Sequence, residues 1–368
     1  MKTVLHIITS LGSGGAEGVL YRLCAHSNNY KHIVINLTSK SFYNKKLEAL
    51  NVNVYNIEMD KNFFKFIEII KIIKREKPDT VQTWMYHADF LGGILAKLLG
   101  VNRVFWCVRN SNLKFGQSSF NTILVSKICS FLSYFIPNRI ISCAHVAMDY
   151  HTSVGYKKNK FVVIPNGVEA NTFYYDREMC RVKNEKKTPT IGMIARFDRQ
   201  KDHGNLFQAL KSISQRGYEF KVRLVGRGIN NKNQELSKLI LESGLVVDTD
   251  VFLVDETQSI RQQIDKIDIH VLSSAYGEGF PNTISETMAC GVPNVVTNVG
   301  DSAHIVGDYG IVVPHSDSQS LATAIIEYID IRKEKRDWEI LQKKCEERIR
   351  LNFSTITMVD KFETVWAE

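Results

Sequence analysis

Residues 277–293 read Gly-Glu-Gly-Phe-Pro-Asn-Thr-Ile-Ser-Glu-Thr-Met-Ala-Cys-Gly-Val-Pro. Glu278 and Glu286 stand on either side of a Gly-Phe-Pro turn, and a helix is expected to begin between them. Asn282 or Thr283 can cap that helix, and Thr283 with Glu286 has the spacing of a capping box. A helix start offers N–H groups and partial positive charge, which suit a phosphate. The segment can therefore hold a phosphate-bearing polyhydroxyl ligand, although a Glu in a first helical turn also serves simply to balance the helix dipole.

This stretch closely resembles the donor-sugar motif of the family-4 glycosyltransferases, retaining enzymes of the GT-B fold. Their motif has Gly-Phe-Pro after a first Glu, a second Glu at the helix and Gly-Val-Pro after it, and every element is present here. The resemblance covers nearly the whole chain and is strongest in residues 160–315. It implies two Rossmann-like, doubly wound α/β domains that face each other across a cleft, with a C-terminal helix crossing back to the N-terminal domain.

The composition is that of a soluble globular protein with room for two domains, at 368 residues, 44% hydrophobic and 23% charged. No apolar run reaches the roughly 18 residues of a transmembrane helix, so none is expected. Met1–Ile8 is interpreted as a strand, because it lacks the longer apolar core and the cleavage site of a signal peptide. The seven cysteines are odd in number and show no paired spacing, which favours reduced thiols. We therefore expect a cytoplasmic protein.

Positive charge is concentrated in the first half of the chain. Residues 1–175 hold 21 Lys and Arg against 10 Asp and Glu, a net of +11, and the remainder holds 26 against 29, a net of −3. Such an excess predicts an anionic partner, for example a membrane surface, a lipid-linked phosphate or a nucleic acid. Taken with the resemblance, it favours the inner face of the cytoplasmic membrane, and no nucleic acid is expected. Plain solubility explains the same charge equally well.

Short β-branched runs alternate with helical patterns along the chain, which is typical of doubly wound α/β units. Strands are expected at 4–9, 32–37, 80–83, 103–108 and 139–143, and again at 190–195, 221–225, 251–254, 269–273, 293–297 and 310–313. The polar stretch Tyr174–Lys187 is predicted to link the two copies of the pattern. We expect an acceptor-side domain over 1–173 and a nucleotide-sugar domain over 174–352. A helix over 353–368 either crosses back to the first domain or docks on its own.

Three loops that follow predicted strands carry candidate donor contacts, since ligands bind at the carboxyl edge of open parallel sheets. The first loop reads Gly-Ser-Gly-Gly, and its glycines let the backbone at Gly14 and Gly15 approach a ligand closely. In the second, Arg196 and Lys201 bracket a turn and can converge on a diphosphate. Gly226 belongs to the third, which resembles the family's glycine turn beneath the nucleotide.

Further candidates lie in the first domain. His87 follows the strand at 80–83, where the family places a histidine near the sugar hydroxyls and the leaving phosphate. Asp89 can orient that histidine, bind acceptor or cap a helix. Arg109 and Asn110 follow the next strand and resemble acceptor or sugar contacts.

Three other segments are candidates for an architectural turn, a base-binding loop and a metal site. Asn166 and Gly167 resemble the family's Pro-Asn-Gly turn at the cleft edge. The base-binding loop is expected at 254–258. The Asp-Thr-Asp triplet at 248–250 has the pattern of a metal site in the unrelated GT-A fold. Asp is frequent in surface turns for local hydrogen-bonding reasons, so no metal is expected there.

The resemblance implies a catalytic set of Glu278, His87, Arg196 and Lys201. Arg196 and Lys201 would stabilise the departing diphosphate without a metal or other cofactor. Glu278 would contact the sugar as an oxocarbenium-like state develops, acting either as a nucleophile or as a positioning group. The full donor-binding set is Gly14, Gly15, Arg196, Lys201, Gly226, Gly279, Phe280, Pro281, Asn282, Thr283 and Glu286, with Glu286 on the ribose hydroxyls.

The implied reaction moves a hexosyl or N-acetylhexosaminyl group, with retention of configuration, from a nucleotide-diphosphate sugar, preferably a UDP-sugar. The implied acceptor is a sugar hydroxyl of a lipid-diphosphate-linked or surface-polysaccharide precursor, such as O-antigen or capsule. Ile123–Ile136, with Lys127 among apolar residues, suits either a peripheral membrane contact or a buried helix. A non-catalytic two-domain sugar-binding protein and a sugar-nucleotide epimerase of the same fold remain alternatives. A dehydrogenase is disfavoured, because no dinucleotide fingerprint follows the first strand.

Overall fold

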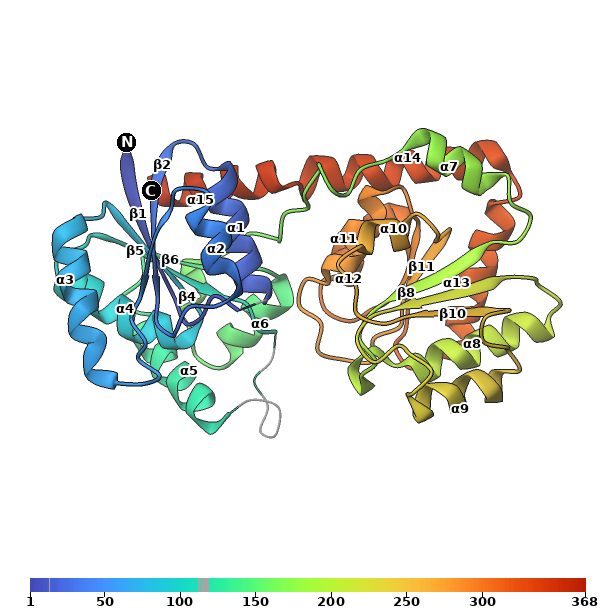
Figure 1. The fold of residues 1–368 in the computed structure, drawn as a ribbon, viewed down its shortest axis with the longest axis horizontal. Helices are drawn as coiled ribbons and strands as arrows, with labels where there is room; N and C mark the ends of the chain where they lie inside the picture. The colour runs from blue at the N-terminus through green and yellow to red at the C-terminus, as the bar shows by residue number, and fades with distance from the viewer. Residues whose placement is uncertain (13, 112, 114–118) are drawn as a thin grey trace. The chain divides into compact units, whose positions relative to one another are not determined.

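The computed structural model describes residues 1–12, 14–111, 113 and 119–368, apart from the side chain of Phe63. Within them the chain forms two compact units, Met1–Gly167 with Thr355–Glu368, and Val168–Ser354. Each unit is one parallel sheet with helices against it (Figure 1). The predicted fold of two Rossmann-like, doubly wound domains is confirmed, and the C-terminal helix does return to the first unit.

The sheet of the first unit has the order β3-β2-β1-β4-β5-β6-β7, and every neighbouring pair is parallel. Its strands are β1 (Lys2–Ile8), β2 (Tyr30–Asn36), β3 (Asn53–Asn56), β4 (Thr80–Trp84), β5 (Arg103–Val108), β6 (Arg139–Ser142) and β7 (Phe161–Val163). The two edge strands, β3 and β7, were not predicted. The strand order runs 3-2-1 and then continues with β4, so the winding of the chain reverses between β1 and β4. Ligands bind at such a reversal in doubly wound sheets.

Alternate residues of the first sheet feed two separate cores, because side chains along a strand point to opposite faces. Leu5 and Ile7 of β1 pack with α3 (Phe66–Glu76), α4 (Tyr86–Leu98) and α5 (Phe120–Leu132). Val4 and Ile8 pack on the other face, where the helices are α1 (Gly15–His26), α2 (Phe42–Glu48) and α15 (Thr355–Ala367). The remaining helix of this unit is α6 (His145–Ser153).

The second unit repeats the strand order, as β10-β9-β8-β11-β12-β13. Its strands, all predicted from the sequence, are β8 (Thr190–Ile194), β9 (Lys221–Val225), β10 (Val251–Val254), β11 (Ile269–Leu272), β12 (Asn294–Thr297) and β13 (Ile311–Val313). Its helices are α7 (Arg177–Asn184), α8 (His203–Gln215), α9 (Gln234–Ser243), α10 (Ile260–Ile264), α11 (Asn282–Ala289), α12 (Ser302–Val306), α13 (Ser318–Ile331) and α14 (Lys335–Asn352). The helix α8 packs on both α9 and α13, and α11 packs with α12 and α14.

The stretch Tyr174–Lys187, predicted to link the two domains, lies within the second unit, which begins at Val168, and contains the helix α7. Lys183 is buried and its Nζ donates to the carbonyl of Ile267 at 2.9 Å. Asn184 accepts from Nε1 of Trp338 at 3.1 Å. The polar composition of this stretch gave no sign that one side of the helix faces the interior. Cys180 is buried on that side together with Lys183.

The C-terminal helix α15 is held to the first unit by specific polar contacts as well as by apolar packing. Nε1 of Trp366 donates to Gln82 Oε1 at 3.0 Å, and Glu363 accepts from Ser27 Oγ at 2.7 Å. At its start, a Cβ added to Gly167 would lie 2.6 Å from Cα of Thr355. This close approach explains a glycine in the Pro-Asn-Gly turn. Across the described residues, none of the helices combines the length and apolar character needed to cross a bilayer.

Candidate functional site

Glu278 is the most firmly held of the candidate residues. It lies between β11 and α11 and is 7% exposed. Its Oε1 accepts from Nζ of Lys201 at 2.5 Å and from Oγ of Ser274 at 2.5 Å. Lys201 is itself only 13% exposed, so the two charges compensate each other out of contact with most of the solvent. The structure thus joins two predicted site residues directly, through an ion pair that the sequence did not predict.

The loop after β8 is hydrogen-bonded to the segment that follows β11, which fixes the backbone position of Lys201. Oγ of Ser273 donates to the backbone carbonyls of both Lys201 and Asp202 at 3.0 Å. The backbone N–H of Ala275 donates to the carbonyl of Gln200 at 2.9 Å. Because three backbone carbonyls of this loop are bound to the segment that follows β11, the Lys201 side chain starts from a fixed point.

Arg196 lies on the same loop but has different contacts. Its Nε is 3.4 Å from Oδ2 of Asp198, and its Nη2 donates to Oε1 of Gln200 at 2.9 Å. The backbone N–H of Gln200, and then Arg196, lower the pKa of the Asp198 carboxyl. Arg196 is about half exposed, so its guanidinium can still turn to an incoming anion. Arg196 forms its ion pair with Asp198 and Lys201 forms its ion pair with Glu278, and their predicted convergence on a diphosphate stays a prediction.

The turn that carries Glu278 is packed against the loop after β12. Gly300 has φ +65°, and a Cβ there would lie 2.7 Å from both Cβ and the carbonyl oxygen of Glu278. The N–H of Asp301 donates to the carbonyl of Gly279 at 2.9 Å. Phe280 continues the turn into the interior, with its ring 5.6 Å from that of Phe353. Gly300 is therefore required by the close approach of the two loops.

The helix α11 begins one residue earlier than the capping pattern predicted. Pro281 is the N-cap, and among the described side chains none caps the helix. The predicted capping box between Thr283 and Glu286 is wrong, because Thr283 already lies within the first turn. Asn282 and Thr283 are partly exposed in this turn, and Glu286 is partly exposed in the next one. The amide dipoles there favour an anion.

Gly226 is fixed by packing between the loops after β8 and β9. It has φ +145°, and a Cβ there would lie 2.9 Å from the backbone nitrogen of Arg196. The N–H of Phe197 donates to the carbonyl of Arg227 at 2.8 Å. In the predicted base loop, Asp255 accepts from the N–H of Gly228 at 3.0 Å, so its side chain joins the chain's own loops together.

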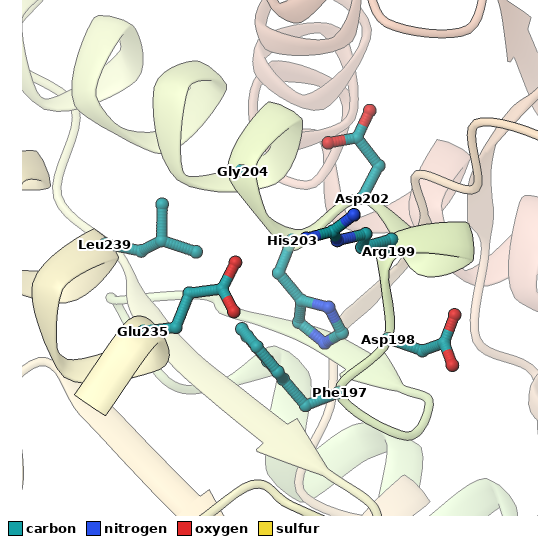
Figure 2. Close-up of a pocket in the computed structure, with 8 residues that line it drawn as sticks. All are labelled: Phe197, Asp198, Arg199, Asp202, His203, Gly204, Glu235 and Leu239. Carbon is teal, nitrogen blue, oxygen red and sulfur yellow. The ribbon is translucent and has the colours of Figure 1, made fainter. Parts of the chain in front are cut away.

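A pocket of about 380 Å³ opens beside the β8 loop, between the starts of α8 and α9 (Figure 2). Its lining residues are Phe197, Asp198, Arg199, Asp202, His203, Gly204, Glu235 and Leu239. His203 is buried, and within the described part of the chain neither of its ring nitrogens has a partner. Burial, and then the charge of Lys201, lower the pKa of His203 to about 4, so the ring is neutral at pH 7.

Three residues near the predicted site were missed by the sequence reasoning. Ser274 follows β11 at the sheet's carboxyl edge, a position that could have been noticed from the strand pattern alone. His203 directly follows the charged loop, so its position could have been noticed in the same way. Gly300 carries no local signal, because its role arises from a contact with Glu278.

In the first unit, Gly14 and Gly15 form the start of α1, directly after the β1 loop. Gly14 is the N-cap and Gly15 the first helical residue. Ser13 of the same loop lies outside the described residues. A Cβ on Gly14 would collide with the carboxylate of Glu17, whereas one on Gly15 would meet nothing within 4 Å in the described chain. Gly15 therefore leaves open space beside a helix N-terminus.

His87 stands at the start of α4, exposed to solvent, after a strained backbone position. Met85, the N-cap, has φ +71° and ψ 158°, a conformation that costs a non-glycine residue about 1–3 kcal/mol. Partial loss of hydration lowers the pKa of His87, so its imidazole is neutral at pH 7. Asp89 is fully buried, and its Oδ1 accepts from Oγ1 of Thr83 at 2.5 Å. Asp89 is thus part of the core, neither a helix cap nor an exposed acceptor ligand.

Arg109 and Asn110 follow β5. Nη1 of Arg109 donates to Oδ1 of Asn166 at 2.5 Å, and its guanidinium lies 5.5 Å from the centre of the Trp84 ring. Asn110 contacts the hydroxyl of Tyr86 and lowers its pKa against the larger, opposing effect of burial. The predicted acceptor residue Arg109 and the predicted architectural residue Asn166 therefore belong to one cluster.

Two groups of side chains have metal-ligand chemistry. The 248–250 triplet is a surface turn, in which Oδ2 of Asp250 accepts from the N–H of Val246 at 3.0 Å. His6, Cys24 and His32 bring three ligand atoms within 4.8 Å of one another. However, Nε2 of His6 lies 2.9 Å from Nδ1 of His32, and its Nδ1 accepts from Trp84. Because both nitrogens of His6 are engaged, this group is a hydrogen-bonded part of the core.

Comparison with known families gives two matches that together span most of the chain. The model described as "Glycosyltransferase Family 4" matches residues 13–172, and that described as "Glycosyl transferases group 1" matches residues 176–344. A UDP-Gal:alpha-D-GlcNAc-diphosphoundecaprenol alpha-1,3-galactosyltransferase of Escherichia coli is 24% identical over 353 residues, which cover 85% of this chain and 81% of that protein. The capsular polysaccharide biosynthesis glycosyltransferase CapM of Staphylococcus aureus is 23% identical, over 84% and 82%.

Solved structures share the fold at lower identity. HepE of Anabaena, in complex with UDP, has a TM-score of 0.83 at 18% identity, with 100% of both chains covered. A glycosyltransferase of Rickettsia africae has a TM-score of 0.79 at 19% identity, with 99% of this chain and 97% of that chain covered. These likenesses extend over both units.

Proposed function

The chain belongs to the family-4 glycosyltransferases of the GT-B fold, and we propose that it transfers a hexosyl or N-acetylhexosaminyl group from a UDP-sugar with retention of configuration. The observation that carries this proposal is the Glu278 carboxylate, held by Lys201 and Ser274 at the carboxyl edge of the second sheet. A carboxylate fixed in this way can meet a sugar while the cation beside it meets a phosphate.

The leaving group of the proposed reaction is a nucleoside diphosphate, whose charge grows as the glycosidic bond breaks. Lys201 and Arg196 would bind it, the first as a point charge and the second as a fork. In the free chain Lys201 is paired with Glu278, so donor binding would give its ammonium a second anion. Groups of this kind typically contribute about 3 kcal/mol each to the transition state. The proposed reaction requires no metal.

The two carboxylates of the 277–293 segment would have separate roles. Glu286, partly exposed in the second turn of α11, would accept hydrogen bonds from the ribose. Glu278 would position the sugar and stabilise its positive charge as the bond breaks. His87, neutral at pH 7, would donate a hydrogen bond to the sugar or the leaving phosphate. The departing phosphate would take the acceptor's proton, so no separate base is needed.

The first unit would supply backbone contacts and the acceptor site. The amides at Gly14 and Gly15 would approach the diphosphate, which the open space beside Gly15 supports. Arg109 and Asn110 would contact the acceptor. Because Arg109 is already bound to Asn166, it would present a fixed charge to that acceptor.

We propose a sugar hydroxyl on a lipid-diphosphate-linked or surface-polysaccharide precursor as the acceptor. The name of the E. coli relative, which includes a diphosphoundecaprenol, supports this choice. A lipid-linked acceptor would be met at a membrane surface, and the positive excess of residues 1–175 favours the anionic inner face of the cytoplasmic membrane.

The proposal is tested by incubating the protein with a panel of UDP- and GDP-sugars and measuring nucleoside diphosphate release. A binding sugar nucleotide at a hundredfold excess over its Kd should stabilise the fold by about 2.7 kcal/mol, which thermal shift detects. Lys201→Ala and Glu286→Ala should both lower release, and Lys211→Ala, on the exposed face of α8, is the control.

Three results would separate the alternatives. Unchanged release in both site variants would contradict the site. Stabilisation without release, even with acceptor glycans present, would indicate a binding protein. Recovery of an isomeric sugar nucleotide without transfer would indicate an epimerase.

A further inference from the structure

The helix α5 in the first unit has apolar residues on two faces. On the inner face Ile123, Ser126 and Cys129 are buried. Four large apolar residues then lie on the outer side at the spacing i, i+4, i+8, i+11, which forms one stripe along a helix. They are Phe120 (66% exposed), Leu124 (47%), Ile128 (39%) and Phe131 (66%). A helix on the surface of a globular domain normally carries polar residues at these positions.

The stripe continues beyond the end of α5 into an aromatic cluster. Tyr134 is 48% exposed and Phe135 65%. The rings of Phe131 and Phe135 lie 5.5 Å apart, and those of Tyr134 and Phe135 lie 6.4 Å apart. Exposed apolar residues gathered in this way mark interaction surfaces on soluble proteins.

Lysines surround the aromatic cluster. Nζ of Lys157 lies 4.8 Å from the centre of the Tyr134 ring, and Nζ of Lys160 donates to the carbonyl of Tyr134 at 2.9 Å. Partial burial, and then the charges of Lys157 and Lys97, lower the pKa of Lys160. Lys127 adds an exposed cation on α5 itself. Like charges held this close repel one another, and a polyanionic partner would relieve that repulsion.

The surrounding sequence offers these lysines almost no acidic partner. From Phe90 to Val168 the chain contains a single carboxylate, Asp149, against nine Lys and Arg. The charge of this region therefore complements an anion outside the chain.

We propose that α5 and the segment after it dock on an anionic phospholipid bilayer. The docking face consists of Phe120, Leu124, Lys127, Ile128, Phe131, Tyr134 and Phe135, with Lys97, Lys157 and Lys160 beside it. The apolar stripe enters the boundary between headgroups and acyl chains, and the lysines remain at the lipid phosphates with their stems on apolar surface. A second copy of the chain fits this face poorly, because a two-fold contact would bring the lysine cluster against itself.

The docking requires no transfer chemistry, so it and the proposed function can fail separately. The test is co-sedimentation of the full chain with phosphatidylcholine vesicles and with vesicles that also contain 30% phosphatidylglycerol. We expect binding to the anionic vesicles, weakened as salt screens the lysines. The variant Phe131→Ser/Phe135→Ser should lower the partition coefficient at least about tenfold. Leu241→Ser/Ile340→Ser, at two exposed apolar positions of the second unit, should leave it unchanged.

The charge is tested with matched triple variants. Lys127→Gln/Lys157→Gln/Lys160→Gln should weaken anionic-vesicle binding by about fivefold for each lysine. Lys232→Gln/Lys238→Gln/Lys343→Gln makes the same change in net charge on the second unit and should have little effect. Near-UV circular dichroism checks that every variant is folded.

Three outcomes would overturn the docking. One is equal binding to neutral and anionic vesicles. Another is retained binding in Phe131→Ser/Phe135→Ser. The third is lipid-free self-association that the same variant abolishes, which would make this face a contact between copies. If vesicle binding follows the expected pattern but nucleoside diphosphate is never released, the docking stands and the proposed reaction fails.

Discussion

The loop after β1 and the loop after β8 follow the first strand of two sheets with the same strand order, yet they differ in composition. The loop after β8 carries the charged residues Arg196, Asp198 and Lys201, and its backbone is hydrogen-bonded to the segment that follows β11. The loop after β1 is glycine-rich, and Gly15 leaves open space at the start of α1. One loop positions charged side chains, whereas the other offers exposed backbone.

Under the proposed function, the two loops would bind the donor in different ways. Side-chain cations bind strongly, but they need partners such as Glu278 that keep them in place while the donor is absent. Backbone amides are fixed by the helix that follows and need no such partner. Changes in the second unit should therefore have large effects on both chemistry and stability, and changes at the β1 loop should act mainly on donor affinity.

The largest expected effect is at the Lys201–Glu278 pair. Lys201→Ala and Glu278→Ala should each lower the turnover of donor about 10²–10³-fold, since each removes charge stabilisation from the transition state. Each should also destabilise the second unit by about 3 kcal/mol, because one buried charge loses its partner. Donor hydrolysis and urea unfolding measure the two effects.

A double-mutant cycle tests whether the pair is one element. The Lys201→Ala/Glu278→Ala protein should be more stable than the two single losses added together, since neither charge is then left alone. Additive losses would mean that the two residues act independently and would break the contrast between the loops.

The sequence predicted unit 2 better than unit 1 for reasons that can be traced to particular strands. The strands of the second sheet are rich in Val, Ile and Leu, whereas β3 reads Asn-Val-Tyr-Asn. β3 is an edge strand with half-buried side chains, so the signal of a buried parallel strand is absent from it. That reason does not extend to β7, which reads Phe-Val-Val and is as short and apolar as the predicted edge strand β13.

The candidate site shows the same limit. Glu278 and Lys201 can be named as candidates because each belongs to a local motif. Their ion pair was not predicted, because it joins residues that are 77 positions apart in the sequence. Ser274 and Gly300 acquire their roles only through contact with Glu278. A local pattern contains no information on such contacts.

The next largest effect is acid sensitivity, which should differ between the units. Burial lowers the pKa of the five buried histidines, to about 4 for His32, His151, His203 and His270, and well below its usual value for His6. In the unfolded chain these histidines have a pKa near 6.5, so between pH 6.5 and 4 the unfolded chain binds more protons than the folded chain. The free energy of unfolding therefore decreases as the pH is lowered through this range. Each of the four shifts to about 4 corresponds to about 3 kcal/mol in full. Three of the five histidines lie in the first unit, which should be the more acid-labile.

The Trp338→Phe variant makes this measurable, because the remaining tryptophans, Trp84, Trp106 and Trp366, all lie in the first unit. Urea unfolding of this variant at pH 7.5 and 5 reports that unit alone by fluorescence. In the second unit, His203→Gln should remove about one proton from the pH dependence, and the exposed His315→Gln serves as its control. Equal acid sensitivity of the two units would contradict the assignment.

A smaller effect is expected at Gly300, which tests the packing behind Glu278. Gly300→Ala places a methyl group against the Glu278 backbone at φ +65° and should cost about 2 kcal/mol or more, with a loss of turnover. Gly217→Ala has a similar φ of +82° but, in the described chain, open space around the added Cβ. It should cost only about 1 kcal/mol and leave turnover unchanged. Equal costs would mean that backbone strain, not contact with Glu278, decides the effect.

The smallest expected effect is at Gly15, where the first unit is proposed to use backbone instead of side chains. In the free protein Gly15→Ala adds a methyl group to open space within a helix and should stabilise the fold by up to about 1 kcal/mol. If a diphosphate approaches this backbone, the same methyl group obstructs it, so KM for the donor should rise several-fold while kcat changes little. A more stable protein with weaker donor binding is a combination that damage to the fold cannot produce. An unchanged KM would remove the β1 loop from the donor site and leave the cations of the β8 loop to hold the diphosphate alone.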